Sequence, residues 1–291
     1  MKARTSLKSY AFIFPSFLLI GVFFYYPVFY AISGSFTDLR LGEKASFIGF
    51  GNYLKLLEDP VFLKGLANQL FLTIADVLKS ILFPLLAAEL LYFIKHKGTA
   101  AKIRTFFVIP MLVPGMVVML MWVYMYDVNF GAVNTLLEQL GLGAWKHDWL
   151  KESETALWSI VGIGFPFVSG IYFLIFHAGL ASISGEVEEA ALIDGCSSWN
   201  RVRYIHLPHI FPYFGVVFIL TMIASLQDYV KILVTTRGGP GYDTYVPALH
   251  MYNTAFKSYE MGYASSMGVI LFIIIIAFTV VSMKLSHNRQ A

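Results

Sequence analysis

Two residues with hydroxyl groups and one with a carboxylate lie at helical spacing near the end of the fifth long apolar run of the chain. Thr221, Ser225 and Asp228 are four and three residues apart, so on a helix their side chains share one face. A polar face on an apolar helix turns to a cavity or to another helix, because lipid offers no hydrogen-bond partner. The pattern therefore predicts either a site for a polar solute or hydrogen bonds between helices.

A pair of oppositely charged residues, Asp76 and Lys79, lies inside the second apolar run. A charged side chain costs at least about 2.5–3.5 kcal/mol at the centre of a bilayer, so such residues are candidates for function. Their spacing of three places both side chains on one side of a helix. We expect a structural ion pair that neutralises both charges, and a direct role in transport is the alternative.

The apolar runs that carry these charges are long enough to cross a membrane. Of the 291 residues, 57% are hydrophobic and 13% are charged, whereas soluble domains carry about 25% charged residues. Helices satisfy every backbone group in lipid, and the alternating pattern of a barrel is not visible. The sequence therefore predicts an all-α integral membrane protein with six transmembrane helices, at about 10–33, 67–94, 103–126, 155–178, 205–235 and 263–284.

The distribution of lysine and arginine predicts the orientation of these helices. Eleven of the 21 basic residues fall in the termini and two short connections on one side, and eight fall in the longer segments on the other side. Basic residues are enriched in the cytoplasmic segments of membrane proteins, so both termini are predicted to lie in the cytoplasm. The predicted organisation is a cytoplasmic N-terminus at 1–9, a transmembrane domain at 10–285 and a cytoplasmic tail at 286–291. A polar loop at about 180–208 then also faces the cytoplasm.

This polar loop carries the signals of a short surface helix. Ser184 can cap the helix, acids follow at Glu186, Glu188 and Glu189, and Gly195 can end it in a left-handed conformation. An exposed helix with a face of small residues suits a groove on a partner protein, and a solvated loop without a partner is the alternative.

The loop also resembles a known motif. Glu189-Ala190-Ala191, Asp194-Gly195 and Ile205-x-Leu207-Pro208 are similar to the cytoplasmic "EAA" loop of permease subunits in bacterial binding-protein-dependent ABC importers. In that family the loop forms a coupling helix that docks on an ATPase subunit. The resemblance implies a type I ABC importer permease fold, with ATPase docking by Glu186, Glu189, Ala190, Ala191, Asp194 and Gly195. Cys196 and Val202 depart conservatively from the motif.

A second resemblance narrows the family. The segments Gly238-Gly239-Pro240 with Thr244, Tyr252 to Phe256, and Ile109 to Pro114 are similar to the first of two paired permeases in carbohydrate importers of the maltose and glycerol-phosphate type. The resemblance implies uptake of a sugar or oligosaccharide by alternating access. The positions that would bind the sugar are Thr221, Ser225, Asp228, Met111, Gly115, Gly164 and Phe165.

The resemblance also implies a set of partners in the bacterial cytoplasmic membrane. These are a second homologous permease, two ABC ATPase subunits and an extracytoplasmic sugar-binding protein. Gly238 to Gly241 lacks the Lys-Ser/Thr of a phosphate-binding loop, so no cofactor is expected in this chain, and ATP and Mg²⁺ would be bound by the ATPases.

Two other classes of function remain open on the sequence alone. A membrane-embedded enzyme would use Asp76, Asp228 and the histidines as acid-base groups, and a secondary transporter would carry a proton on Asp228. No catalytic motif is visible. His206 and His209 are three residues apart, but a third ligand is not apparent, so no metal site is predicted.

Overall fold

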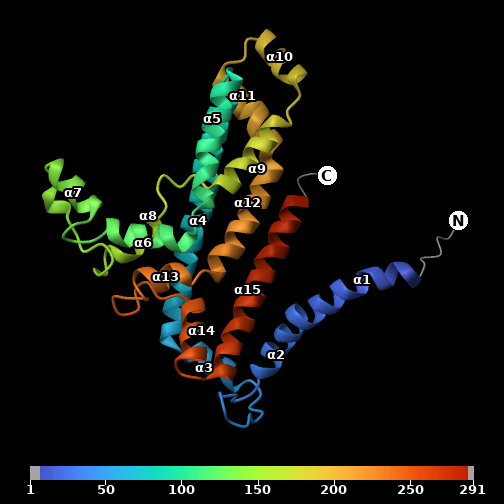
Figure 1. The fold of residues 1–291 in the computed structure, drawn as a ribbon, viewed down its shortest axis with the longest axis vertical. Helices are drawn as coiled ribbons and strands as arrows, with labels where there is room; N and C mark the ends of the chain where they lie inside the picture. Colours follow the sequence, from blue (N-terminus) through green and yellow to red (C-terminus); the bar gives the residue numbers. More distant parts are fainter. Residues whose placement is uncertain (1–6, 288–291) are drawn as a thin grey trace. The chain divides into compact units, whose positions relative to one another are not determined.

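The computed structural model describes residues 7–287, whose regular secondary structure is helical apart from an isolated antiparallel bridge between Thr37 and Phe47. The chain divides into two compact units, whose helices are labelled in Figure 1. One unit comprises the chain through Pro60 together with His250–Ile273, and the other comprises Val61–Leu249 together with the segment after Ile273. Residues 1–6 of the predicted N-terminal segment and 288–291 of the predicted tail lie outside the described residues.

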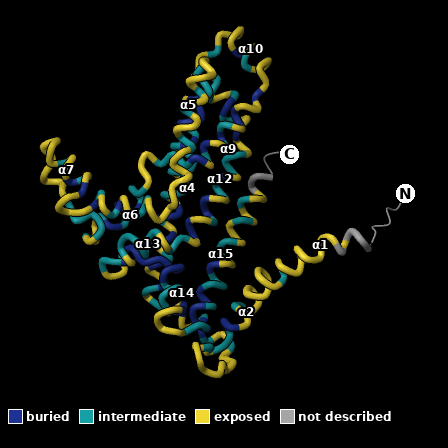
Figure 2. The backbone as a smooth tube through the Cα atoms, in the orientation of Figure 1, coloured by how far each residue is buried: buried dark blue, intermediate teal, exposed yellow. Residues whose placement is uncertain are grey.

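The first unit begins with the first predicted span. Helix α1 (Leu7–Ile20), a π-helical turn (Gly21–Tyr25) and α2 (Tyr26–Gly34) follow one another. In Figure 2 most of α1 and α2 has the colour of exposed residues, and the apolar stretch Phe12–Gly34 has no buried residue in its most apolar window. An apolar helix without protein around it is what a lipid-facing or partner-facing span requires.

Polar contacts join the remaining helices of the first unit. The unit contains α3 (Gly51–Glu58), most of α14 (Pro247–Phe256) and the start of α15 (Met261–His287). Asp59 accepts hydrogen bonds from Tyr263 at 2.7 Å and from His250 Nε2 at 2.9 Å. Glu260 pairs with Arg40 at 3.1 Å and with Lys55 at 2.9 Å. These side chains hold the ends of α3, α14 and α15 together.

The second unit is built around three helices that pack side by side. They are α4 (Pro60–Tyr92), α9 (Gly170–Ala181) and α12 (Leu207–Gln227). Their shared core is apolar and is formed by Ala87, Ala88, Leu91, Phe173, Phe176, Leu180, Ile183, Ile210 and Val217. The buried stretches of α4, α9 and α12 in Figure 2 mark this core. Burial of each of the larger of these side chains is worth about 1.5–3 kcal/mol and holds the three helices against one another.

The third predicted span, 103–126, is broken rather than continuous. Helix α5 (Lys97–Val108) continues into a 3₁₀ turn at Ile109–Leu112, and α6 (Gly115–Met125) starts in a direction bent by 89°. Pro114 lies between the two helices, lacks a backbone N–H and disfavours helical geometry in the residue before it. The two halves therefore meet at a corner that sequence periodicity does not show.

The fourth predicted span, 155–178, is also interrupted. After α7 (Ala132–Gln139), α8 (Ala156–Gly162) ends, residues 163–169 are not helical, and α9 then begins. Gly164 has φ +88° and Phe167 has φ +63°, conformations that a right-handed helix does not contain. The helix α9 alone is about 18 Å long and does not cross a 30 Å core.

The fifth predicted span, 205–235, has different ends from those expected. The helix starts at α11 (Ser198–Arg201), continues through a π-helical turn (Val202–His206) into α12, and ends at Gln227. Asp228 is extended, with ψ 98°, and its carboxylate accepts a hydrogen bond from the backbone N–H of Lys231 at 3.1 Å. This local bond competes with the helix ladder, so a short helix, α13 (Val230–Thr235), starts anew.

Within the described residues, four helices are long and apolar enough to cross a bilayer. They are Phe12–Gly34, Pro60–Tyr92, Ser198–Gln227 and Met261–Lys284. Two bent pairs raise the number to as many as six: α5 with α6, and α9 with α10 (Gly185–Ile193), the second pair bent by 68°. Three glutamates within α10 instead favour the predicted surface position for that helix.

Candidate functional site

A cavity of about 480 Å³ opens in the second unit between α4, the non-helical segment before α9, α12 and α13. Its wall combines charged, hydroxyl and aromatic side chains. The lining residues are Asp76, Lys79, Ser80, Ile163, Gly164, Phe167, Val168, Ser169, Thr221, Ala224, Ser225, Asp228 and Lys231. A volume in the range of about 300–1,000 Å³ is typical of sites for small molecules.

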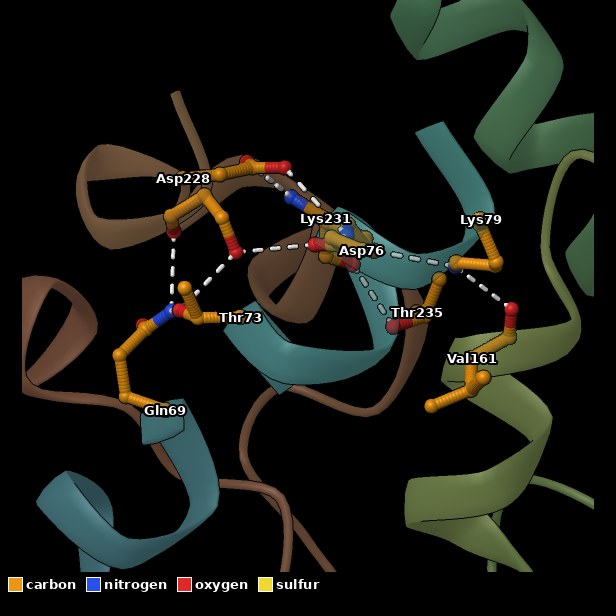
Figure 3. A network of polar contacts seen from close by, with 9 residues as sticks. Gln69, Thr73, Asp76, Lys79, Val161, Asp228, Lys231 and Thr235 are labelled. Carbon is orange, nitrogen blue, oxygen red and sulfur yellow. Dashed lines mark hydrogen bonds and ion pairs between the residues drawn. The ribbon is translucent and has the colours of Figure 1, made fainter. Parts of the chain in front are cut away.

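Four charged side chains form a chain of ion pairs along this wall (Figure 3). Asp76 lies 3.0 Å from Lys79 Nζ and 3.1 Å from Lys231 Nζ, and Lys231 Nζ lies 3.9 Å from Asp228. The predicted Asp76–Lys79 pair is therefore present. Lys231 joins it across 155 residues of sequence, a contact that no local pattern indicates. Two acids and two bases leave the wall with no formal net charge.

Ser225 uses its polar groups within the protein. Its hydroxyl donates to Asp76 at 2.9 Å and lies 3.2 Å from the hydroxyl of Thr73, and its carbonyl accepts a bond from Gln69 at 2.9 Å. All three partners lie on α4 (Figure 3). Ser225 thus connects α12 to α4. Hydrogen bonds between helices were one of the two roles that the sequence analysis predicted for this polar face.

The other two residues of the predicted polar face are placed differently. The buried hydroxyl of Thr221 has no hydrogen-bond partner within the described part of the chain, and it lies in the cavity wall. Asp228 ends the helix α12 instead of continuing its face, and its side chain keeps 28% of its surface exposed. The partly exposed Asp228 carboxylate is therefore available to a polar solute, whereas the Thr221 hydroxyl is buried in this conformation.

The remaining predicted binding residues do not all reach this cavity. Gly164 lines it and also borders a neighbouring cavity of about 380 Å³, which Phe165 lines as well. Met111 and Gly115 line neither of these two cavities. Met111 lies in the 3₁₀ turn and its sulfur packs near Gly170, while Gly115 begins α6. The break at Pro114 turns this part of the chain away from the path that a straight helix would follow.

Phe167 is a wall residue that sequence reasoning did not select. The Lys79 ammonium lies 5.1 Å from the centre of the Phe167 ring and donates to the carbonyl of Val161 at 2.8 Å. The left-handed backbone of Phe167 brings its ring to the cavity, and nothing in the sequence marks that conformation.

The predicted short helix of the polar loop is confirmed as α10. The Ser184 hydroxyl accepts the backbone N–H of Val187 at 3.4 Å, and Gly195 ends the helix with φ +71°. The N–H of Cys196 donates to the carbonyl of Ala191 at 2.9 Å, which closes the last turn. The backbone thus follows the capping signals in the sequence.

Most of α10 is exposed. Of the six predicted docking residues, Glu186, Glu189, Ala190, Asp194 and Gly195 are exposed, and Ala191 is buried. Ile193 keeps 86% of its surface exposed, and Leu192 is also exposed. Exposed apolar side chains beside acids are typical of a surface that another protein covers.

Three hydrogen-bonded side chains, those of Glu89, His206 and Glu188, form a polar chain behind α10. His206 has no exposed surface, and its Nδ1 lies 2.8 Å from Glu89 of α4 while its Nε2 lies 2.8 Å from Glu188 of α10. The neighbouring His209 instead contacts Ser182 at 2.9 Å. The two histidines therefore do not share a ligand position, and no cluster that could hold a metal occurs among residues 7–287.

Comparisons with known proteins identify the family. Residues 80–291 match the family described as "Binding-protein-dependent transport system inner membrane component". The chain belongs to this family. It is 35% identical over 261 residues to the "Probable ABC transporter permease protein PH1215" of Pyrococcus horikoshii, covering 89% of each chain. It is 33% identical, over the full length of both, to the "Multiple sugar-binding transport system permease protein MsmF" of Streptococcus mutans.

Solved structures agree on the fold of this permease subunit. A bacterial alginate ABC transporter, in complex with an alginate pentasaccharide-bound periplasmic protein, matches with a TM-score of 0.85 at 20% identity and covers 96% of this chain and 93% of its own. The protein is thus an all-helical, multi-pass inner membrane permease of the type I ABC importer fold. It is a transport subunit of an ABC transporter and not itself an ATPase. Family membership therefore excludes the two alternative functions, a membrane-embedded enzyme and a secondary transporter.

Proposed function

We propose that this permease is half of a membrane pathway through which an ABC importer takes up a sugar or oligosaccharide. The observation that carries the proposal is that a chain of this family contains both the polar cavity between α4, α12 and α13 and an exposed α10 helix. Similarity to MsmF and to the alginate transporter, both named for carbohydrate, supports the substrate class. The similarity of the Gly238 to Thr244 segment supports assignment to the first of the two paired permeases.

The cavity chemistry fits a polar solute that carries little charge. The wall offers acceptors on Asp228 and an aromatic ring on Phe167, Thr221 adds a hydroxyl that is buried in this conformation, and the four charges sum to zero. Sugar hydroxyls both donate and accept hydrogen bonds, and the apolar faces of sugar rings pack on aromatic side chains.

The transport cycle requires partners for its energy. A second homologous permease completes the pathway, a binding protein delivers the sugar from outside, and two ABC ATPases bind α10 from the cytoplasm, where both termini lie. ATP and Mg²⁺ bind to the ATPases. Their closure moves α10 and opens the cavity outward, and hydrolysis returns it to the inward-facing state. The docking residues are the six named above, of which Ala191 supports α10 from its buried side.

Purification of the tagged chain from bacterial membranes tests this proposal. The complex should contain a second permease and an ATPase, and sugar-loaded binding protein should stimulate ATP hydrolysis in proteoliposomes. A complex without an ATPase, or uptake that continues without ATP, would contradict the proposal.

Asp228 provides a test of the cavity. Asp228→Ala should lower sugar uptake about tenfold or more, because it removes a charged hydrogen-bond acceptor worth about 1.5–3 kcal/mol. Asp228 also accepts the N–H of Lys231, so Asp228→Asn is the matched variant, since it keeps an oxygen for that bond. Uptake should be measured with thermal stability in detergent. Unchanged uptake with lowered stability would give Asp228 a structural role only.

A further inference from the structure

The polar chain behind α10 connects three helices at their ends. Glu89 lies near the end of α4, His206 lies in the turn that leads into α12, and Glu188 lies in the first turn of α10. His206 has no exposed surface, and its two ring nitrogens each lie 2.8 Å from a carboxylate oxygen. The site in the cavity does not use these residues.

The surroundings of His206 fix its ring in one orientation. Tyr92 packs edge-on at 4.9 Å between ring centres, and Phe93 stacks at 5.7 Å. Arg201 lies 3.5 Å from Glu188 and packs its guanidinium over Phe93 at 4.9 Å. A ring held by two aromatic side chains and two hydrogen bonds cannot rotate away without breaking several contacts at once.

An imidazolium is suited to a position between two carboxylates, because each of its N–H groups can donate to one of them. With Arg201 beside Glu188, the four side chains then balance two negative and two positive charges. Removing one member of such a buried set leaves a charge without its partner, which is far more costly than losing an exposed ion pair.

Two of the helices joined by His206, α4 and α12, also line the cavity. Asp76 lies on α4 about 20 Å from Glu89, and Ser225 lies on α12 about 28 Å from His206, at 1.5 Å per residue. Helix α10 itself has little contact with these helices: of its residues, all of which the structure describes, only Ala191 is buried. The bond from Glu188 to His206 is therefore a main polar link between α10 and the helices of the pathway.

We propose that His206 is a positioning residue that transmits the displacement of α10 to α4 and α12 through Glu188 and Glu89. The inference rests on the proposed role of α10 in docking the ATPases. It adds that the ATPase movement reaches the cavity wall through a buried hydrogen-bonded chain, and not only through the loops that flank α10. Loss of the chain uncouples hydrolysis from transport while the ATPases stay bound.

The test uses the complete complex in proteoliposomes and measures sugar transported per ATP hydrolysed. His206→Gln and Glu89→Gln should each lower this ratio about tenfold, with ATPase copurification unchanged. Glu89→Gln should add little to His206→Gln, because the two act as one unit. The control is His209→Gln, which alters an exposed histidine three residues away that contacts Ser182, the residue directly after α9. Its ratio should equal that of the wild type.

The outcomes separate this inference from the proposed function. A wild-type ratio in both His206→Gln and Glu89→Gln, or additive effects in the double variant, would overturn the positioning role. If His206→Gln does not assemble, Glu188→Gln provides the same measurement, with the same expected and contrary results. Failure of the wild-type complex to couple uptake to ATP would instead refute the proposed function.

Discussion

Replacement of Gly195 by leucine is expected to abolish sugar uptake while the permease remains in the membrane. Gly195 has φ +71°, and a side chain in that conformation costs about 1–2 kcal/mol. That strain alone is too small to prevent folding. Nothing lies within 4 Å of the position of an added Cβ, so the leucine would project from the end of α10 toward the docked ATPase. Loss of uptake would therefore follow from blocked docking.

Gly141 offers a matched control for this variant. It has φ +74° and open space around it, so Gly141→Leu carries the same backbone strain at an exposed position outside the docking loop. Uptake of radiolabelled sugar, the amount of permease in the membrane and ATPase copurification should be measured for both variants. Gly141→Leu should retain all three. Normal uptake by Gly195→Leu would remove the main support for α10 as the coupling helix.

Replacement of Asp76 by alanine should strongly destabilise the permease. Asp76 is the only carboxylate within 4 Å of Lys79 among the described residues, and it also pairs with Lys231. Breaking a buried ion pair by removing one partner costs about 3–5 kcal/mol, because the remaining charge stays desolvated. Lys79 would lose this carboxylate, and Lys231 would keep the more distant Asp228 at 3.9 Å. Thermal stability of the detergent-solubilised protein measures this loss directly.

An exposed ion pair provides the comparison for Asp76. Glu138 and Lys146 lie 3.1 Å apart and are both substantially exposed, so Glu138→Ala should change the stability by less than about 1 kcal/mol. The double variant Asp76→Asn with Lys231→Met should recover part of the stability lost in Asp76→Asn. If Asp76→Ala is as stable as the wild type and loses only transport, Asp76 acts directly on the solute and the structural interpretation is wrong.

Features of the fold with local causes could be predicted from the sequence. The ends of α10 follow from Ser184 and Gly195, because capping involves residues within one turn. The approximate positions of the apolar helices follow from hydropathy alone. The break after α12 could not be predicted, since Asp228 fits a helical face as well as it fits a local cap, and the tertiary structure decides between them.

Contacts between distant residues were the main part of the site that the sequence did not reveal. Lys231 and Asp76 are separated by 155 residues, and His206 and Glu89 are separated by 117. Each residue alone is an ordinary charged or titratable group in an apolar run. The tertiary structure brings α4 beside α13, which carries Lys231, and beside the turn before α12, which carries His206. Charge patterns along one helix can therefore identify only the pair Asp76 and Lys79.

The non-helical segment at 163–169 has a consequence for how such a permease changes its substrate range. Residues of this segment line the cavity, and their main-chain groups lie outside the regular helix ladder. Bonds from the Phe165 N–H to Gly162 and from the Phe167 N–H to Gly164 set the path of this backbone and therefore the shape of the cavity wall. Discrimination among sugars would then depend on the path of the backbone. Substitutions that introduce or remove a proline or a glycine in this segment would change the substrate specificity of such a permease during evolution.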